Sequence, residues 1–192
     1  MSTLKIVVSS TRPGRIGAPI AQWIADRARA LGTFDRVELL DLAEFALPLF
    51  DEPHHPRTGN YTRPHTKAWA AAVAEADALI ITTPEYNHSF PATIKNALDY
   101  LHAEWRDKAL GLVGYAGVSG GRNAVQALTP VTDALGLVQV EPVTLVKAMA
   151  SVVDGEFLGS ADDAAAVDTM IGRLAELDRE LAPRRSEDAL AS

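Results

Sequence analysis

Segments of strand length alternate with segments of helical periodicity five times along this chain, and this alternation limits the folds open to it. The predicted strands are short and bounded by turn residues, as buried parallel strands are. They cover residues 4–8, 36–41, 78–83, 110–116 and 137–140, and the last is extended by 143–147. Alternation without a repeat or linker predicts an open parallel sheet with helices on both faces and right-handed crossovers. We expect five strands in the order 2-1-3-4-5.

Apolar residues at helical spacing predict the intervening helices. The first begins near Gly17 and stops at Gly32, and the last covers residues 161–181, with Pro183 ending it. Residues 42–61 form an irregular segment, which we interpret as a rim of the site or a subunit contact. We therefore predict one domain over residues 1–182 and a disordered tail over 183–192.

The first strand runs into a loop, SSTRPGRIG over residues 9–17, that suits an anion. Backbone N–H groups are unsatisfied where the next helix starts, and the helix dipole is positive there. Ser10 and Thr11 can donate from hydroxyls, and Arg12 or Arg15 can add a charged contact. The loop matches neither standard nucleotide-binding loop, which disfavours dinucleotide-fold and nucleoside-triphosphatase functions. A polar turn that only caps the helix is the alternative.

The third strand runs into a second loop, PEYNHSFP over residues 84–91, that suits a flat polar ring. Tyr86 can pack on such a ring, while Asn87 and loop N–H groups can bond its oxygens and nitrogens. An unpaired carboxylate would oppose a ring that becomes anionic on reduction, so we expect Glu85 to point elsewhere or to pair with a cation. The alternative is a plain helix start with Tyr86 in the core.

The fourth strand is followed by Ser119, Gly120 and Gly121, which are small enough for a ring edge to approach the backbone N–H groups. Donors there stabilise the negative charge of a ring that becomes anionic on reduction. A glycine-rich helix cap is the alternative. In the expected strand order the first and third strands adjoin the point where ligands bind. A phosphate loop beside a ring loop indicates flavin mononucleotide (FMN).

These loops and the helix after the second one carry a family resemblance. The motif SxR from Ser10, the glycines at 14 and 17, and the string PEYNxSxPxxxKNALDYL over residues 84–101 resemble the NADPH-dependent FMN reductase family of flavodoxin-like quinone, azo-dye and chromate reductases. The resemblance covers residues 5–140. It implies a flavodoxin-like three-layer α/β fold, bound FMN, and NADPH or NADH as co-substrate.

The resemblance also implies three groups of cofactor-binding residues. The phosphate would be held by Ser10, Arg12, Arg15, Ile16 and Gly17. The ribityl chain and ring would be lined by Pro84, Glu85, Tyr86 and Asn87, and the other side of the ring by Ser119, Gly120 and Gly121. The family usually has Gly-Ser at residues 9–10 and often a hydroxyl residue at position 15, so the phosphate contacts of this chain depart from the family pattern.

The activity implied by the resemblance is hydride transfer from NAD(P)H through FMN to a small acceptor: a quinone, azo compound, flavin or metal oxyanion. The flavin supplies the chemistry, so no side chain is assigned as catalytic. A homodimer or homotetramer is implied, with Lys95 and Asp99 paired within a helix or between subunits. Two alternatives are a flavodoxin-like electron carrier and an FMN-binding or sensor protein without NAD(P)H turnover. A third is an anion-binding interaction protein without flavin.

The amino-acid composition disfavours several other kinds of function and binding site. The formal net charge of −7 disfavours nucleic-acid binding. No apolar run approaches the roughly 20 residues of a membrane span, and the N-terminus has no secretory signal, so we expect a cytoplasmic protein without membrane contact. The absence of cysteine excludes disulfide and thiolate chemistry, so redox activity requires an organic cofactor. The five histidines lack metal-ligand spacing, and no metal is expected.

Overall fold

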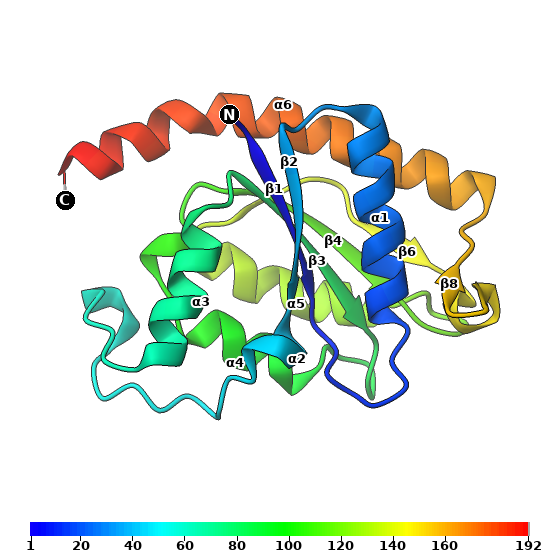
Figure 1. Cartoon of the computed structure of the whole chain (residues 1–192), viewed down its shortest axis with the longest axis horizontal. Coiled ribbons are helices and arrows are strands. Elements are labelled where there is room, and N and C mark those ends of the chain that lie inside the picture. Colours follow the sequence, from blue (N-terminus) through cyan, green and yellow to red (C-terminus); the bar gives the residue numbers. More distant parts are fainter. Residues whose placement is uncertain (192) are drawn as a thin grey trace.

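A twisted parallel sheet forms the centre of the computed structural model, which describes residues 1–191, with side chains described as far as residue 186 (Figure 1). Its strands are β1 (Thr3–Val8), β2 (Arg36–Asp41), β3 (Ala78–Pro84), β4 (Ala109–Tyr115), β5 (Val138–Gln139) and β6 (Val143–Leu145). The order β2-β1-β3-β4-β5 confirms the prediction, and β6 also pairs with β4. The predicted extension of the last strand is therefore a second short strand on the same partner.

The helices cover both faces of the sheet, as predicted. The longer ones are α1 (Gly17–Leu31), α3 (Pro64–Ala74), α4 (Ala92–Asp99), α5 (Arg122–Ala134) and α6 (Ala161–Ala191). One core cluster joins α1 and α6 to the sheet, and a second cluster on the other face holds α3, α4 and α5. Every residue of β1, β3 and β4 is buried because both faces of these strands are covered.

The pairing register brings the carboxyl ends of three strands together. Val8 of β1 lies opposite Thr82 of β3, and Pro84 of β3 lies opposite Tyr115 of β4. The chain leaves all three strands at this edge and enters α1, α4 and α5. Side chains from segments far apart in the sequence therefore meet there.

The irregular segment 42–61 contains two short helical turns, α2 (Leu42–Phe45) and η1 (Pro56–Thr58), and is fixed to α4. The Asn96 amide donates to the Pro48 carbonyl at 2.7 Å and accepts from the Phe50 N–H at 2.9 Å. The Tyr100 hydroxyl donates to the Asp51 carboxylate at 3.0 Å. Two residues of the family string thus hold this segment against the domain, which apolar periodicity could not indicate.

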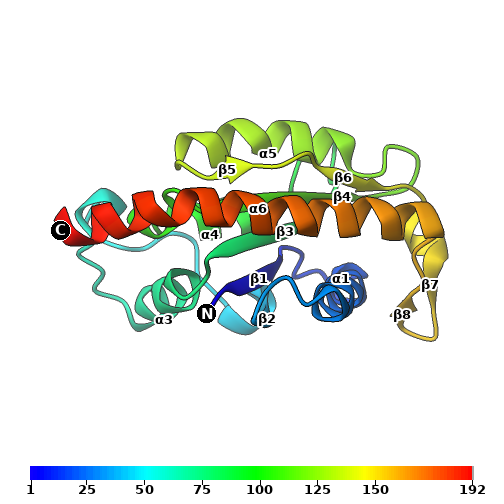
Figure 2. The ribbon, with the colours of Figure 1, turned by 90° about the horizontal axis from the view of Figure 1, so that it is seen from above.

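The end predicted for the last helix is wrong, because α6 continues through Pro183 to Ala191 and lies along the length of the molecule (Figure 2). A proline inside a helix removes one backbone hydrogen bond and disfavours the preceding turn. Beyond it, Arg185 donates to the Asp107 carbonyl at 2.9 Å and pairs with Asp178 two turns back, which ties the helix end to the loop before β4. The domain boundary at 182 and a disordered tail in solution stay predictions, and Ser192 lies outside the described residues.

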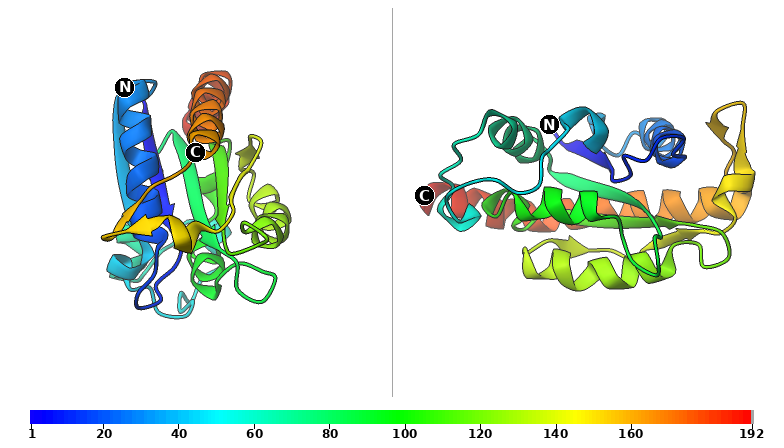
Figure 3. Two further views of the ribbon diagram at one scale, coloured as in Figure 1. Left: turned by 90° about the vertical axis from the view of Figure 1, so that its right-hand side faces the viewer. Right: turned by 90° about the horizontal axis from the view of Figure 1, so that it is seen from below.

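A small antiparallel hairpin of β7 (Val152–Val153) and β8 (Glu156–Phe157) was not predicted. Its strands are too short to leave an alternating pattern. The hairpin lies beside α1 at one end of the molecule (Figure 3), where the rings of Phe157 and Trp23 pack edge to face with centroids 5.2 Å apart. Two more 3-10 turns, η2 (Ala103–Trp105) and η3 (Ala148–Ser151), complete the structure. No helix within residues 1–191 has both the length and the apolar character of a membrane span.

Candidate cofactor-binding site

Three loops meet at the carboxyl edge of the sheet, after β1, β3 and β4. In Figure 1 the blue loop after β1 and the green loop after β3 lie at the same end of the sheet. The hydroxyls of Ser10 and Tyr86 are 2.8 Å apart and join these two loops. The Glu85 carboxylate accepts from the Asn123 N–H at 3.0 Å, which joins the second loop to the start of α5. The three loops therefore lie next to one another, as predicted.

The first loop leaves the start of α1 open to an anion. Its N-cap residue, Ile16, provides no side-chain cap, so the first-turn N–H groups are not satisfied by a capping hydroxyl or carboxylate. Ser10 is almost fully buried beside this helix start. Gly17 has no space for a side chain, because an added Cβ would lie 2.4 Å from the Tyr115 Oη. The helix start is therefore bordered by the hydroxyls of Ser10 and Tyr115 and has backbone N–H groups free of a side-chain cap.

The two arginines of the first loop behave differently. Arg15 donates to the Asp41 carboxylate at 2.5 Å and to the Ser10 carbonyl at 2.9 Å, so it braces the loop against the end of β2. Arg12 is exposed, and its side chain forms no ion pair or hydrogen bond with any of the described residues. Arg12 is therefore the charge available to a ligand, whereas Asp41 neutralises Arg15. The sequence pattern could not separate these roles.

The second loop is a tight turn from Tyr86 to Ser89. The backbone N–H of each of these residues donates to the carbonyl of the other, at 2.8 and 3.0 Å. Asn87 and His88 between them have φ values of 51° and 63°, as a type I′ turn requires. The turn exposes both side chains. Among the described side chains no hydrogen bond restrains the Asn87 amide, so it is available to a ligand.

Glu85 does not lie unpaired. Its side chain is only 9% exposed. One carboxylate oxygen accepts from the Asn123 backbone N–H, and the other from the Asn123 side chain at 2.8 Å. Burial alone would raise the pKa of Glu85, but the hydrogen bonds from Asn123 and Ser119 together outweigh burial and lower that pKa. The carboxylate therefore caps α5, and Asn123 is a linking residue that the sequence analysis missed.

In the third loop, the backbone at Gly121 packs directly against the backbone of Gly114 and Tyr115 at the end of β4. Gly120 and Gly121 have φ values of 63° and 86°. A Cβ on Gly121 would lie 2.3 Å from the Tyr115 backbone nitrogen, so no other residue fits without displacement of the loop. Ser119 accepts a 3.4 Å hydrogen bond from the Gly121 N–H. This tight packing fixes the backbone N–H groups that the sequence assigned to a ring edge.

Tyr115, at the end of β4, is a second residue that the sequence analysis left out. Its side chain is buried and its hydroxyl has no hydrogen-bond partner among the described residues. Burial raises the pKa of Tyr115, so the phenol keeps its proton across the physiological range. Its place in the expected fourth strand concealed it, because a strand tyrosine ordinarily belongs to the core.

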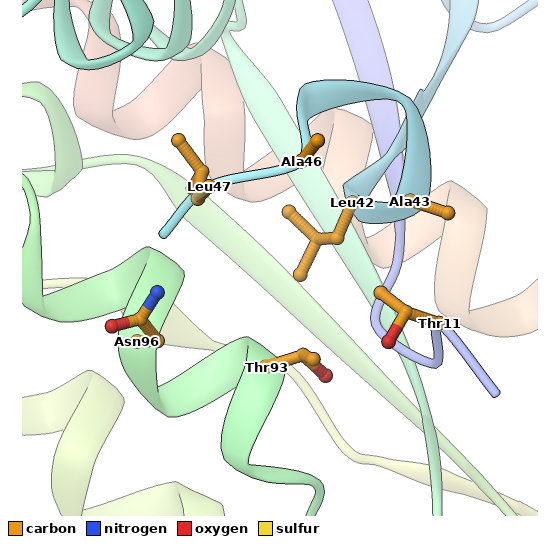
Figure 4. Close-up of a pocket in the computed structure, with 7 residues that line it drawn as sticks. All are labelled: Thr11, Leu42, Ala43, Ala46, Leu47, Thr93 and Asn96. Carbon is orange, nitrogen blue, oxygen red and sulfur yellow. The ribbon is translucent and has the colours of Figure 1, made fainter. Parts of the chain in front are cut away.

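A cavity of about 320 Å³ adjoins the first loop (Figure 4). Thr11 of that loop, residues of α2, and Thr93 and Asn96 of α4 line it. A second cavity, of about 570 Å³, lies between residues 50–56 and His102. None of the predicted cofactor residues lines either cavity. The described side chains include no cluster of three or more potential metal ligands.

Residues 2–151 match the family model described as NADPH-dependent FMN reductase. The chain belongs to this family. Its fold is shared with the flavoenzyme NAD(P)H:(acceptor) oxidoreductase FerB from Paracoccus denitrificans, with a TM-score of 0.74 at 21% identity over 94% of this chain and 98% of that one.

Two family relatives carry NAD(P)H-dependent FMN reductase names. The protein from Schizosaccharomyces pombe is 41% identical over 123 residues, which cover 63% of this chain and 61% of that relative. The protein from a Nectria species is 31% identical over 159 residues, which cover 80% of this chain and 79% of that relative. The chain thus spans less than two thirds of the S. pombe relative.

Two features of the site fit the FMN that the name of this family implies. The start of α1 lacks a side-chain cap, and the buried Tyr115 hydroxyl points at it without a partner among the described residues. The assignment of individual contacts, including the twelve residues predicted from the sequence, stays a prediction.

The predicted pair of Lys95 and Asp99 forms within helix α4. The Lys95 Nζ lies 2.6 Å from the Asp99 carboxylate.

Proposed function

We propose that this chain binds FMN where the three loops meet and passes hydride from NADPH or NADH through it to a small electron acceptor. The observation that carries the proposal is the joined set of loops around an uncapped helix start, held by the Ser10–Tyr86 and Glu85–Asn123 contacts. Bound FMN would supply the hydride chemistry. The protein supplies binding, orientation and charge stabilisation.

The phosphate would be held at the start of α1. Ser10 can turn its hydroxyl to the phosphate, Arg12 can reach it as an unpaired cation, and the backbone at Ile16 and Gly17 offers N–H donors. Arg15 belongs to the predicted set, but its bonds to Asp41 and the Ser10 carbonyl favour a role in shaping the loop.

The ring would lie between the second and third loops. Pro84, Glu85, Tyr86 and Asn87 would line one side, and Ser119, Gly120 and Gly121 the other. The unrestrained Asn87 amide can donate to the polar ring edge. Donors at that edge stabilise negative charge gained on reduction. Because the Glu85 carboxylate is bound to Asn123, it does not direct an unpaired negative charge at the ring.

We further propose a cytoplasmic homodimer or homotetramer. Family membership supports an assembly, and the irregular segment offers apolar surface for it, since Leu49 is 83% exposed and Phe50 is 41% exposed. Light scattering coupled to gel filtration measures the assembly. A monomer at micromolar concentration contradicts it.

The absorption spectrum of the purified protein, followed by an NADPH titration without air, tests the function. We expect flavin bands that bleach on NADPH addition and return when a quinone is added. Flavin bands that neither NADPH nor NADH bleaches would indicate an electron carrier instead. A colourless protein that takes up no added FMN would contradict flavin binding altogether.

A further inference from the structure

Tyr115 presents a buried polar group that the protein chain leaves without a partner. The residue is 4% exposed at the last position of β4. Its hydroxyl makes no hydrogen bond within the described residues. Buried polar groups are nearly always paired, because an unpaired one loses the hydration it had in the unfolded chain. The hydroxyl therefore indicates a partner that comes from outside the chain.

The hydroxyl points at the start of α1. A Cβ built on Gly17 would lie 2.4 Å from the Tyr115 Oη and 3.4 Å from its Cζ, so the tip of the ring touches the first residue of the helix. Ile16 leaves that helix start without a side-chain cap. An uncapped helix start and an unpartnered phenol thus face the same place, although the chain reaches them from two different strands.

The groups around this hydroxyl leave it as a donor. The Ser10 hydroxyl is a polar neighbour of the Tyr115 hydroxyl, but its hydrogen bond, at 2.8 Å, is with Tyr86, and no bond of ordinary geometry joins it to Tyr115. Arg15, the nearby cation, is bound to Asp41 and to the Ser10 carbonyl. Because burial raises the pKa of Tyr115, the phenol stays protonated. A neutral phenol beside unsatisfied N–H groups suits an anionic acceptor, and hydrogen bonds to charged acceptors are the stronger ones.

We propose that Tyr115 is a further phosphate-binding residue, whose hydroxyl donates a hydrogen bond to a phosphate oxygen held at the start of α1. The identity of that phosphate as the FMN phosphate rests on the proposed function. The unpartnered hydroxyl and the uncapped helix start do not depend on it. Since Tyr115 contacts the phosphate and not the ring, it contributes to binding of FMN but not of riboflavin, which has the same ring without a phosphate.

Equilibrium dissociation constants of FMN and riboflavin for Tyr115→Phe and the unsubstituted protein test this. The substitution removes one oxygen and keeps the ring packing. We expect the dissociation constant of FMN to rise by about tenfold or more, as for loss of a hydrogen bond to a charged group. We expect the riboflavin constant to be unchanged. Tyr61→Phe is the matched control, because its hydroxyl bonds to Glu104 at 2.8 Å away from the three loops, and it should change neither constant.

An equal loss of FMN and riboflavin binding in Tyr115→Phe, or no loss of FMN binding, would overturn the proposal. If the unsubstituted protein binds no flavin, the proposed function fails, and inorganic phosphate decides the role of Tyr115. One outcome is that phosphate raises the melting temperature of the unsubstituted protein and of Tyr61→Phe but not that of Tyr115→Phe. That result supports Tyr115 as a hydrogen-bond donor to bound phosphate. An equal rise in all three proteins, or no rise in the unsubstituted protein, overturns it.

Discussion

Single residues at the carboxyl edge divide into those already bonded within the protein and those left available. Arg15 and Glu85 are bonded, to Asp41 and Asn123, whereas Arg12 and Asn87 have no side-chain partner among the described side chains. A sequence motif gives residue types but not this division. The partners Asp41 and Asn123 lie in other segments, and their pairing depends on the assembled sheet.

Replacement of Asn87 by glycine should weaken FMN binding. Asn87 has a φ of 51°, which glycine adopts without strain, so Asn87→Gly removes the amide without burdening the turn. We expect the dissociation constant of FMN to rise by about twofold to tenfold, as for loss of one neutral hydrogen bond. Flavin fluorescence titration measures it. Unchanged FMN affinity in Asn87→Gly would contradict the role assigned to the amide.

Gly17 should tolerate alanine only when the Tyr115 hydroxyl is removed. A Cβ at residue 17 would lie 2.4 Å from that oxygen, so we expect Gly17→Ala to lower the free energy of unfolding by about 1–3 kcal/mol. Combination with Tyr115→Phe should restore part of that loss, which urea unfolding measures. Gly117→Ala, with open space around its Cβ, is the control. Strictly additive losses in the double variant would argue against the contact.

At the scale of elements, the irregular segment shows what periodicity cannot predict. The strands and longer helices follow from apolar spacing, because burial on one or both faces leaves a pattern in the sequence. Segment 42–61 is instead held by polar contacts with Asn96, Tyr100 and the backbone after residue 61. Such contacts leave no periodic signal. The strands β7 and β8 escaped prediction for a different reason, because two residues are too few to show an alternating pattern.

The Glu52 carboxylate should make the stability of this segment depend on acid pH. It accepts hydrogen bonds from the N–H groups of Thr62 and Arg63, at 2.9 and 2.8 Å. Burial would raise the pKa of Glu52, but these backbone bonds outweigh burial and lower that pKa to about 2, from 4.5 in an unfolded chain. A lowered folded-state pKa means that the stabilisation is complete above the unfolded value and is lost as the pH falls toward 2.

Urea unfolding of Glu52→Gln therefore should show a clear loss of stability at pH 6. That loss should shrink as the pH falls from 4.5 toward 2, because the Glu52 carboxylate of the unfolded chain takes up a proton in this range while the native one stays ionised. Glu141→Gln, at an exposed loop position, is the control and should show no such trend. A difference between the Glu52 variant and the unsubstituted protein that is constant over this range would contradict the assigned role.

At the scale of the whole molecule, α6 ties the end of the chain to the edge of the sheet opposite the candidate site. Arg185 contacts the Asp107 carbonyl and Asp178. The Asp178 side chain is only 9% exposed, so loss of Arg185 would leave a buried carboxylate unpaired. The alternation of strands and helices predicted the layers, but a proline inside the last helix concealed this contact.

Two truncated chains test whether the stable domain ends at residue 182 or includes Arg185. A chain of residues 1–182 should fold, bind FMN as the full chain does and melt several degrees lower, about 2–4 °C for each kcal/mol lost. A chain of residues 1–186 keeps Arg185 and should melt close to the full chain. Differential scanning calorimetry measures both. Equal melting temperatures for the two truncated chains would show that the Arg185 contacts add no stability.

The meeting of Ser10, Tyr86 and Tyr115 also bears on the order of events during biosynthesis. These hydroxyls lie at the ends of β1, β3 and β4, so the place where they converge exists only after three strands separated by long stretches of sequence have paired. A partly synthesised chain has none of that binding surface. The cofactor therefore cannot template folding of the N-terminal half, and stabilises the finished domain by mass action once the sheet is complete.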